Sequence, residues 1–528
     1  MEHVRLALRG EGGYRQYRIP ALAVTKSGRL IAIYDGRADF DDLPAPIDLV
    51  MRISDDSGKS WSDQKIFRKH EGTSGYGDAS IIVDPTYGEL GRIIVLYQYT
   101  RDAGFFESVV GSSLEDPKIA HIARSISDDD GATWTHDFIT DQLKDSQTEG
   151  IFATSGSGAR VKHGKFAGRL LQTFVLRRGP QLLSSIGFSD DHGQTWSLGA
   201  EIPGGNETAI ESLGDGTILI HSRATPFRMR AISRDGGLTI EGHAPDKELP
   251  DPSDNGSLCL MSDGSLICSH NHDQDLRRKT LVKRSLDGGK SWPEAVLLER
   301  GSSAYSTVCE LADGNVGVLF ERNSYSEIVF TRVSLNDFKS IDQLPIDLVS
   351  EHGIEFTIIP RCIIPARNQG ALSLISKERP LVPEVDMSQF NLTERKEVGP
   401  VGGSTSGDPL FTSAEYDLML GPISPGLHLG DEIRMSGRLA NQSAAKLHDL
   451  TISHLNSGTC IQRNVLSPAE KVIFLDIRQK VSETDIRTGV ATISISYQAK
   501  LGNITVGEEV SISLSVKTGL PLTEPEAL

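Results

Sequence analysis

The stretch "SDDSGKSW" at residues 54–61 decides how this chain folds, because it recurs along the sequence. The further copies are "SDDDGATW" at 127–134, "SDDHGQTW" at 189–196, "SRDGGLTI" at 233–240 and "SLDGGKSW" at 285–292. Each copy keeps Ser, then Asp, Gly and Ser or Thr at every second position, and all 4 Trp residues of the chain end a copy. Self-similarity at periods of about 45–75 residues indicates a repeated supersecondary unit. We call this motif the Asp box.

The residues around each Asp box predict a hairpin. Apolar alternation precedes the copies, as in "LVMRIS" and "LSSIGFS", and a strand-like run follows them. In the turn, Asp bonds the backbone, Gly supplies a positive φ, and Ser or Thr makes a second local bond. Trp then packs under the turn and locks the hairpin to its sheet. One such unit per four-stranded sheet predicts an all-β fold, a β-propeller, in which the Asp box is structural and not catalytic.

Length and composition limit the number of domains, the class of partner and the kinds of cysteine site. A chain of 528 residues predicts two or three domains. A net charge of -17 argues against nucleic-acid or anionic-membrane partners, so an anionic substrate would need local positive charge. The 5 Cys residues form no CxxC pair, which predicts reduced, buried thiols and neither a disulfide framework nor a zinc site.

The sequence leaves the cellular location open. No stretch approaches the roughly 18 apolar residues of a membrane span, so we expect none. The N-terminal residues lack the apolar region of a signal peptide, which predicts a cytoplasmic protein if this is the natural start. If the start is a processed end, we expect a secreted or cell-surface protein.

The composition and motif content of the sequence change past residue 340, where no Trp or Asp box occurs. We therefore assign residues 1–345 to the propeller, and residues 346–410, rich in Pro, Gly and charge, to a linker or meandering segment. Strand-like runs such as "LHDLTISHL" and "VATISISYQA" alternate with turns in residues 411–528. They predict an accessory immunoglobulin-like β-sandwich.

Several further motifs accompany the Asp boxes in a fixed order. They are "RIPAL" at 18–22, "DGR" at 35–37, "NET" at 206–208, "HSR" at 221–223, an Arg before the last box and "SAYST" at 303–307. With them, residues 10–335 resemble the sialidase (exo-neuraminidase) family, and bacterial members in particular. The resemblance implies a six-bladed propeller and a glycoside hydrolase that releases terminal α-linked sialic acid. The implied partners are sialylated oligosaccharides, glycoproteins or glycolipids, and no metal or cofactor is implied.

The substrate of this family carries a carboxylate at its anomeric carbon, and arginine suits it because the guanidinium stays charged and bonds bidentately. The resemblance assigns this carboxylate clamp to Arg18, Arg223 and Arg277. Arg277 is chosen over its neighbour Arg278 by its distance from the following Asp box. The other resembling positions, which contact the sugar's substituents, are Arg37 and Asp78.

The leaving oxygen requires a proton donor, for which a carboxylic acid with a raised pKa is suited. The acidic loop "DGRADFDDLPAPID" offers several candidates, and the spacing of the family selects Asp42 with Asp41 as its rival. The other candidates in the loop are Asp35, Asp39 and Asp48.

A carboxylate nucleophile would face the substrate's own carboxylate, at a cost of about 4 kcal/mol for charges ~4 Å apart in an effective dielectric of ~20. A phenol avoids this cost if a base takes its proton. The resemblance gives Tyr305 as the nucleophile and Glu207 as its base, with Glu211 as the alternative base.

Other functions would use some of the same residues. Transfer to another sugar (trans-sialidase) and intramolecular formation of an anhydro product share the same first step. A non-hydrolytic sialic-acid-binding propeller would need the clamp but not the acid, the Tyr and the Glu. The loop "SHNHDQD" at 269–275 contains possible metal ligands, but we expect a polar loop, because no separate third ligand group supports a metal site.

Overall fold

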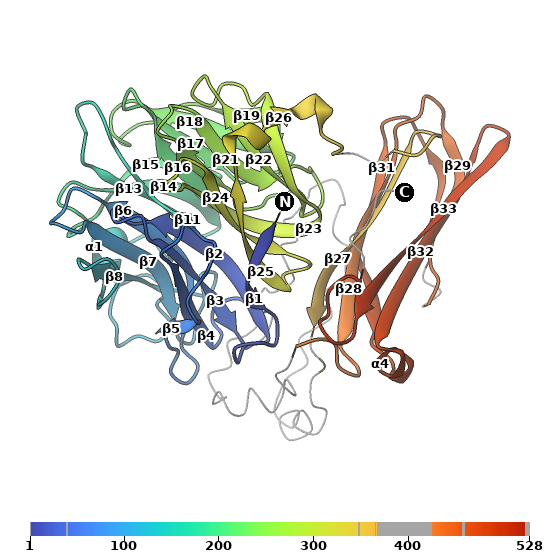
Figure 1. The fold of residues 1–528 in the computed structure, drawn as a ribbon, viewed down its shortest axis with the longest axis horizontal. Coiled ribbons are helices and arrows are strands. Elements are labelled where there is room, and N and C mark those ends of the chain that lie inside the picture. The colour runs from blue at the N-terminus through green and yellow to red at the C-terminus, as the bar shows by residue number, and fades with distance from the viewer. Residues whose placement is uncertain are drawn as a thin grey trace.

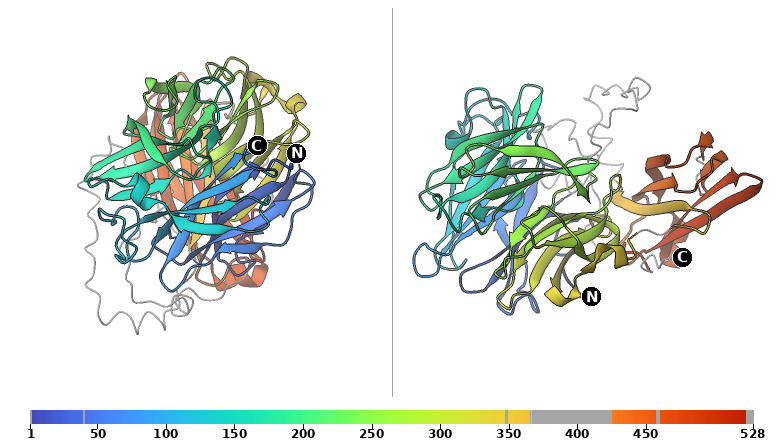
Figure 2. Two further views of the ribbon diagram at one scale, coloured as in Figure 1. Left: turned by 90° about the vertical axis from the view of Figure 1, so that its left-hand side faces the viewer. Right: turned by 90° about the horizontal axis from the view of Figure 1, so that it is seen from above.

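The computed structural model describes residues 2–38, 41–346, 349–364, 366, 425–456 and 460–522. Asp39 and most of the predicted linker lie outside these residues. The described chain forms a ring of sheets with a two-sheet body beside it (Figure 1). The view from above separates the two bodies (Figure 2).

The ring is a six-bladed β-propeller, which confirms the predicted fold class. Blade 1 contains β2 (Gln16–Val24), β3 (Leu30–Arg37), β4 (Ile47–Ser54) and β5 (Lys65–Arg68). Blade 2 contains β6 (Gly75–Asp84), β7 (Arg92–Thr100), β8 (His121–Ser127), β9 (Thr135–Phe138) and the short parallel β11 (Gly156–Ser157). Blade 3 contains β10 (Gly150–Ala153), β12 (Ala159–Arg160), β13 (Leu170–Arg178), β14 (Gln181–Ser189) and β15 (Ser197–Pro203).

Blade 4 is a separate sheet, whereas blades 5 and 6 share a long strand. Blade 4 contains β16 (Thr208–Ser212), β17 (Ile218–Ser222), β18 (Phe227–Ser233) and β19 (Glu241–Pro250). Blade 5 contains β20 (Ser257–Leu260), β21 (Leu266–Asn271), β22 (Arg278–Ser285) and the first part of β23 (Glu294–Glu310), which also pairs with β26 (Lys339–Ser340). Blade 6 contains the rest of β23, β24 (Val316–Arg322), β25 (Glu327–Val333) and β1 (His3–Leu8). The short helices of the propeller are α1 (Thr140–Leu143), η1 (Leu335–Asp337) and η2 (Ile341–Gln343).

The N-terminal strand closes the ring. β1 pairs antiparallel with β25, so that His3 faces Thr331 across the sheet. The last blade is therefore built from both ends of the propeller sequence, and its edge is covered by chain from the beginning of the sequence. Pairing of this kind fixes the positions of all blades around the axis.

Every Asp box forms a hairpin turn between two strands, as predicted, and the strand pairs are β4–β5, β8–β9, β14–β15, β18–β19 and β22–β23. In the copy of blade 3, the Ser189 hydroxyl donates to Asp191 at 2.8 Å and accepts from the backbone N–H of Gly193. The Asp191 carboxylate accepts from the N–H and hydroxyl of Thr195 at 2.9 and 2.6 Å. The same bonds recur in the other copies, including the copy at 233–240 that lacks Trp.

The Trp rings differ from the prediction, because they reach beyond their own sheet. Three of them contact a ring of the preceding blade: the pairs are Trp61–Phe330, Trp134–Phe67 and Trp292–His221, at centroid distances of 5.2, 5.0 and 5.8 Å. The glycine of the box is equally close to that blade, since a Cβ at Gly193 would lie 2.2 Å from Ile94. The Asp box therefore joins adjacent blades as well as closing a hairpin.

The second body is a β-sandwich with one apolar core. One sheet contains β27 (Ile354–Ile364), β28 (Glu432–Asn441) and β31 (Lys471–Lys480). The other contains β29 (Leu447–His454), β30 (Cys460–Leu466), β32 (Val490–Leu501) and β33 (Ile504–Ser515), and α4 (Glu483–Thr488) connects the sheets. The immunoglobulin-like assignment stays a prediction.

The predicted linker is wrong at its beginning. Residues 354–364 form the edge strand β27, which pairs with β28 along its whole length. The reason is physical: "IEFTIIPRCII" is an apolar run whose Ile354 and Ile363 enter the core of the sandwich. The sandwich therefore begins before residue 411.

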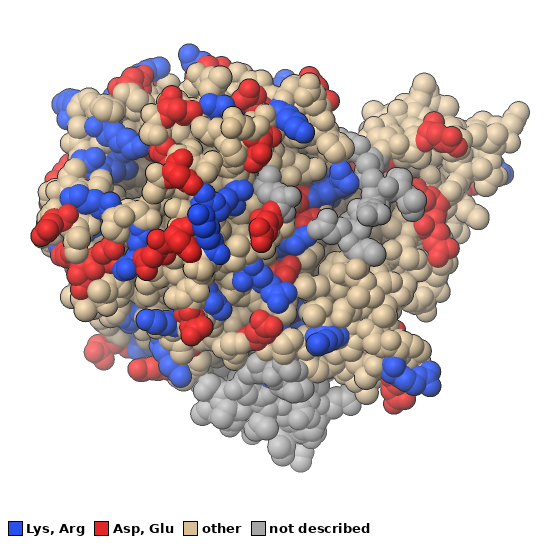
Figure 3. Space-filling model, viewed as in Figure 1, with Lys and Arg blue, Asp and Glu red and all other residues tan. Residues whose placement is uncertain are grey.

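The described residues also bear on the surface charge, on membrane spans and on the state of the cysteines. Acidic and basic side chains are interspersed on the face in Figure 3 and do not gather in one patch. Among the described residues, no helix has the length and apolar character needed to cross a bilayer. Three cysteines with described side chains, Cys259, Cys268 and Cys309, are free thiols.

Candidate active site

Local irregularities of the inner strands place the predicted polar residues. The register of β2 shifts between Arg18 and Ala21, and that of β6 shifts around Asp78. The register of β23 shifts in the same way around Tyr305. Ile19 and Asp78 have positive φ angles of 59° and 58°, which non-glycine residues seldom adopt. Bulges of this kind redirect a side chain out of the regular alternation, here from three different blades.

Arg18 is held by a buried carboxylate that the sequence did not reveal. Its guanidinium donates to both oxygens of Glu321, on β24, at 3.1 and 3.3 Å. Arg18 is 2% exposed and Glu321 is 0% exposed. Burial lowers the pKa of Arg18, but Glu321 together with Tyr325, Asp42 and Tyr305 outweighs this, and the pKa is raised overall. Glu321 also accepts from the backbone N–H of Tyr305, which links the clamp to the predicted nucleophile.

Tyr305 meets its predicted base directly. Its hydroxyl donates to the Glu207 carboxylate, and Arg223 donates to the same carboxylate and to the hydroxyl oxygen. Burial raises the pKa of Tyr305 well above its usual value, although Arg223 opposes this. Glu211, the alternative base, instead accepts from the backbone N–H groups of Ser212 and Leu260. The geometry therefore favours Glu207.

The two neighbouring arginines point in different directions. Arg277 donates to the Ser253 carbonyl at 3.2 Å and pairs with Asp254 at 3.4 Å. Arg278 instead pairs with Asp273 and with Glu355 of the sandwich. Only Arg277 lies against Tyr305, with its guanidinium carbon 5.4 Å from the centre of the ring.

The acidic loop brings Asp42 to the site. Its carboxylate accepts from Arg37 and lies 3.9 Å from Arg18, whereas Asp41 contributes a backbone carbonyl to Arg37. Burial raises the pKa of Asp42, but Arg37 and Arg18 reverse the effect and the pKa is lowered overall. This differs from the raised pKa expected of a proton donor, because the guanidinium groups stabilise the ionised form.

The other aspartates of the acidic loop lie at different positions and have different partners. Asp35 is 0% exposed and accepts from Arg37 at 2.7 Å, and burial raises its pKa to about 6. Asp48 bonds His70 and Tyr14 away from this cluster. Asp39 lies outside the described residues.

Two further carboxyl groups are affected by burial. The pKa of Asp78 is raised well above its usual value by burial and by the nearby Asp35 and Glu207 carboxylates. Burial raises the pKa of Asp254 to about 7, although Arg277 opposes this. Both groups therefore hold protons more tightly than an ordinary aspartate.

Tyr305 is the centre of the arrangement. The guanidinium carbons of Arg18, Arg277 and Arg223 lie 5.2, 5.4 and 5.9 Å from the centre of its ring. Three cations from different blades therefore surround one tyrosine, which is itself 7% exposed. Such a group can hold a small carboxylate beside a hydroxyl that already has a base.

Sequence reasoning missed three residues of the site: Glu321, Asp254 and Tyr325. Each contacts a clamp arginine, with the Tyr325 ring centre 4.5 Å from the guanidinium carbon of Arg18. No spacing rule identifies them, since they contact the arginines only after the blades assemble. The one available signal was an acidic residue at the end of an apolar strand, in "VGVLFER" for Glu321.

The loop "SHNHDQD" is polar, as expected. Its Asp273 and Asp275 form ion pairs with Arg438 of the sandwich. Among the residues that the structure describes, no group of His, Cys, Asp or Glu is arranged to hold a metal ion.

The sequence is similar to those of several known proteins. Residues 28–318 match the family model described as BNR repeat-like domain. The chain is 34% identical to a sialidase of Micromonospora viridifaciens, over 60% of this chain and 51% of that protein. It is 28% identical to a sialidase of Bacteroides fragilis, over 62% of this chain and 64% of that protein. The chain thus covers between half and two thirds of the length of these curated relatives.

Solved structures give the same fold. The Hadza microbial sialidase Hz136 superposes with a TM-score of 0.58 and 27% identity, over 63% of this chain and 68% of that chain. The intramolecular trans-sialidase of Ruminococcus gnavus superposes with a TM-score of 0.54 and 17% identity, over 61% of this chain and 95% of that chain. The second likeness shows the fold alone.

Proposed function

This chain belongs to the BNR repeat-like domain family, and on that premise we propose that it is a retaining exo-sialidase. Its substrates would be terminal α-linked sialic acids of oligosaccharides, glycoproteins and glycolipids. One observation carries the proposal: Tyr305 donates to Glu207 while the three arginines of the clamp surround its ring. A binding protein would need the arginines but not a hydroxyl already bonded to a base.

In the proposed first step, Arg18, Arg223 and Arg277 bind the carboxylate of the sugar and place its anomeric carbon beside Tyr305. The tyrosyl oxygen bonds to the anomeric carbon as the glycosidic bond breaks, and its proton passes to Glu207. The Glu207 base is necessary because burial raises the pKa of Tyr305 and disfavours a free phenolate. A neutral nucleophile also avoids repulsion from the bound carboxylate.

Asp42 is the proposed proton donor to the leaving oxygen. In the described structure its carboxylate binds Arg37 and lies near Arg18, which keeps its pKa low. A substrate carboxylate on Arg18 would compete for that charge and place a second anion nearby, and both effects raise the pKa of Asp42. Substrate binding would thus favour the protonated form of Asp42, which is the form that can donate a proton.

In the second step, water attacks the anomeric carbon and Asp42 takes its proton. The bond to Tyr305 breaks, and the phenol regains its proton from Glu207. Two displacements return the original anomeric configuration. Arg37 and Asp78 would bind the hydroxyl and amide substituents of the ring in both steps.

The test is turnover of α2,3- and α2,6-sialyllactose, followed by proton NMR of the earliest product. Release of the α-anomer is expected, and release of the β-anomer first would contradict retention. Glu207→Gln should lose nearly all turnover, whereas Glu211→Gln, the same change four residues further along the chain in β16, should keep most of it. Absence of free sialic acid with the wild type would refute the function.

The same spectra separate hydrolysis from the related reactions. A sialylated acceptor sugar would indicate transfer, and a product with an internal anhydro bridge would indicate intramolecular attack. Both products would keep the roles of Tyr305 and Glu207, because all three reactions share the first step. Saturable binding without any product would indicate a sialic-acid-binding protein.

A further inference from the structure

We propose that the sandwich is part of the active-site machinery: its strand β27 holds the turn at residues 323–325, which presents Tyr325 as a positioning residue for Arg277 and Arg18. The inference rests on the proposed function, because it concerns how the arginines are held for the substrate carboxylate. It assigns a role to a domain that otherwise only follows the propeller.

Tyr325 contacts two of the three clamp arginines. Arg277 donates to its hydroxyl at 3.1 Å, and the Arg18 guanidinium carbon lies 4.5 Å from the centre of its ring. Tyr325 is 5% exposed, so both contacts are shielded from water. A hydroxyl acceptor and an aromatic face fix the orientation of guanidinium groups without adding a negative charge. The arginines therefore stay available to the substrate carboxylate, which would be repelled if a carboxylate stood in the place of Tyr325.

The turn that carries Tyr325 has an unusual backbone. Asn323, Ser324 and Tyr325 have φ angles of 51°, 59° and 62°, and none of them is glycine. Residues in this left-handed region are strained and persist only where their surroundings fix them. Within the propeller, Asn323 donates to Glu327 at 2.8 Å and to the Ser302 carbonyl at 2.9 Å. These bonds anchor the start of the turn.

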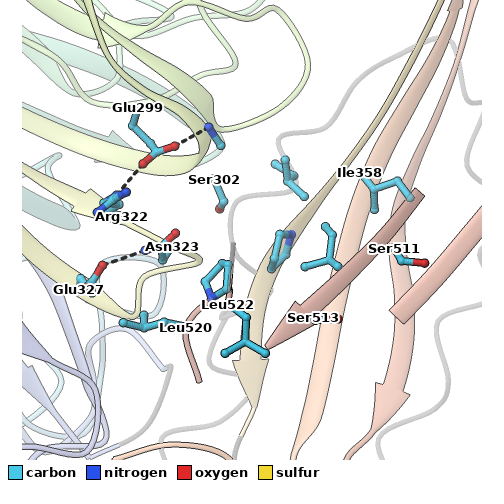
Figure 4. Close-up of a pocket in the computed structure, with 15 residues that line it drawn as sticks. Glu299, Ser302, Arg322, Asn323, Glu327, Ile358, Ser511, Ser513, Leu520 and Leu522 are labelled. Carbon is cyan, nitrogen blue, oxygen red and sulfur yellow. Dashed lines mark hydrogen bonds and ion pairs between the residues drawn. The ribbon is translucent and has the colours of Figure 1, made fainter. Parts of the chain in front are cut away.

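The sandwich anchors the rest of the turn. The Ser324 hydroxyl donates to the Pro360 carbonyl of β27 at 2.7 Å, in a buried contact. Tyr325 shares an apolar cluster with Cys362 of the same strand and with Tyr305. Figure 4 shows Asn323 and Ile358 on facing sides of the groove between the two bodies. The strand is therefore in place to hold the strained conformation.

The same strand also fixes Arg277 from its other side. The adjacent Arg278 donates to Glu355 at 2.7 Å and to Thr357 at 2.9 Å, and both residues belong to β27. Arg438 completes the network through Glu355 at 2.6 Å. Strand β27 thus holds both the backbone next to Arg277 and the tyrosine that receives its side chain, which is more than docking of two domains requires.

The experiment compares Tyr325→Phe with Tyr97→Phe in the full chain, using sialyllactose hydrolysis and thermal unfolding. Tyr97 is a matched control, because it is also buried and bonds Ser125 at 2.8 Å, but lies in blade 2. Loss of one hydrogen bond to a charged group predicts that Tyr325→Phe raises KM by about tenfold or more, with kcat changed less than about twofold. Tyr97→Phe should change neither constant.

Ser324→Ala tests the contribution of the sandwich and is informative even if Tyr325→Phe does not fold. It should raise KM in the same direction, by about two- to fivefold, with kcat unchanged. An unaltered KM in both variants of an active enzyme would overturn the inference and leave the proposed function intact. Equal losses of kcat and thermal stability, with KM unchanged, would also overturn it, since they indicate a structural role. A wild type without turnover would refute the proposed function, and the inference with it.

Discussion

Replacing Arg18 by Met should destabilise the propeller by about 3–5 kcal/mol, because Glu321 would remain buried without its cation. Glu321 is 0% exposed and receives two bonds from the guanidinium. It also accepts from the backbone N–H groups of Ile19 and Tyr305, which persist in the variant and favour the lower end of the range. An unfolding entropy of about 2.1 cal/mol/K per residue over roughly 340 residues converts ~3 kcal/mol into a Tm decrease of about 4 °C.

Thermal unfolding at a fixed scan rate, followed by Trp fluorescence, measures this change. The double variant Arg18→Met with Glu321→Gln should recover about half of the lost Tm, because the amide is neutral and keeps an acceptor for Ile19. Turnover should not recover, since the clamp still lacks Arg18. The control Arg234→Met removes an ion pair whose side chains are both 60% exposed, and should shift Tm by less than about 1 °C. A double variant no more stable than the single one would refute the reasoning.

Three shorter predictions follow. Asp42→Asn should slow cleavage of sialyllactose far more than cleavage of an aryl sialoside, because a phenolate leaves without a proton donor; equal losses of kcat/KM would contradict the acid role. Asp191→Ala should lower the free energy of unfolding by about 1–3 kcal/mol, because the Asp box loses its bonds to Ser189 and Thr195; denaturant unfolding measures this, and KM should not change. KM for sialosides should fall from about pH 8 to about pH 6, because Asp254, with its pKa raised to about 7, becomes protonated and removes negative charge beside Arg277. Asp254→Asn should flatten this pH profile, and an identical profile in the variant would count against Asp254 as its cause.

The sequence was sufficient to predict those parts of the fold and the site that depend on contacts between residues close together in the chain. The Asp box is closed by contacts within seven residues, so its spacing alone predicts the turn, and its recurrence predicts the blades. The spacing within the motifs also selected Arg277 over Arg278 and Glu207 over Glu211, and in the structure Arg277 and Glu207 lie against Tyr305. In each case the information lies within a short stretch of chain.

The sequence was insufficient where partners come from distant elements. Glu321 reaches Arg18 across 303 positions of the chain, and an acidic residue at the end of an apolar strand does not by itself reveal which arginine it binds. The packing of Trp61 on Phe330 depends on ring closure, which no single blade encodes. The run at 354–364 looked like part of a linker because its pairing partner, β28, begins only at residue 432. Long-range pairing is the information that a one-sequence pattern lacks.

The charge of the site explains how an acidic chain can bind an anion. Each arginine near Tyr305 has a carboxylate partner: the pairs are Arg18–Glu321, Arg37–Asp35, Arg223–Glu207 and Arg277–Asp254. If every carboxyl group were ionised, these pairs would cancel, and Asp42 and Asp78 would make the site negative. Burial changes this balance, because it raises the pKa of Asp35 to about 6, that of Asp254 to about 7 and that of Asp78 well above its usual value. The positive charge that the arginines offer to a substrate carboxylate therefore depends on how far these buried acids are protonated, and it increases as the pH falls toward 6. The net charge of -17 therefore says little about what this site binds.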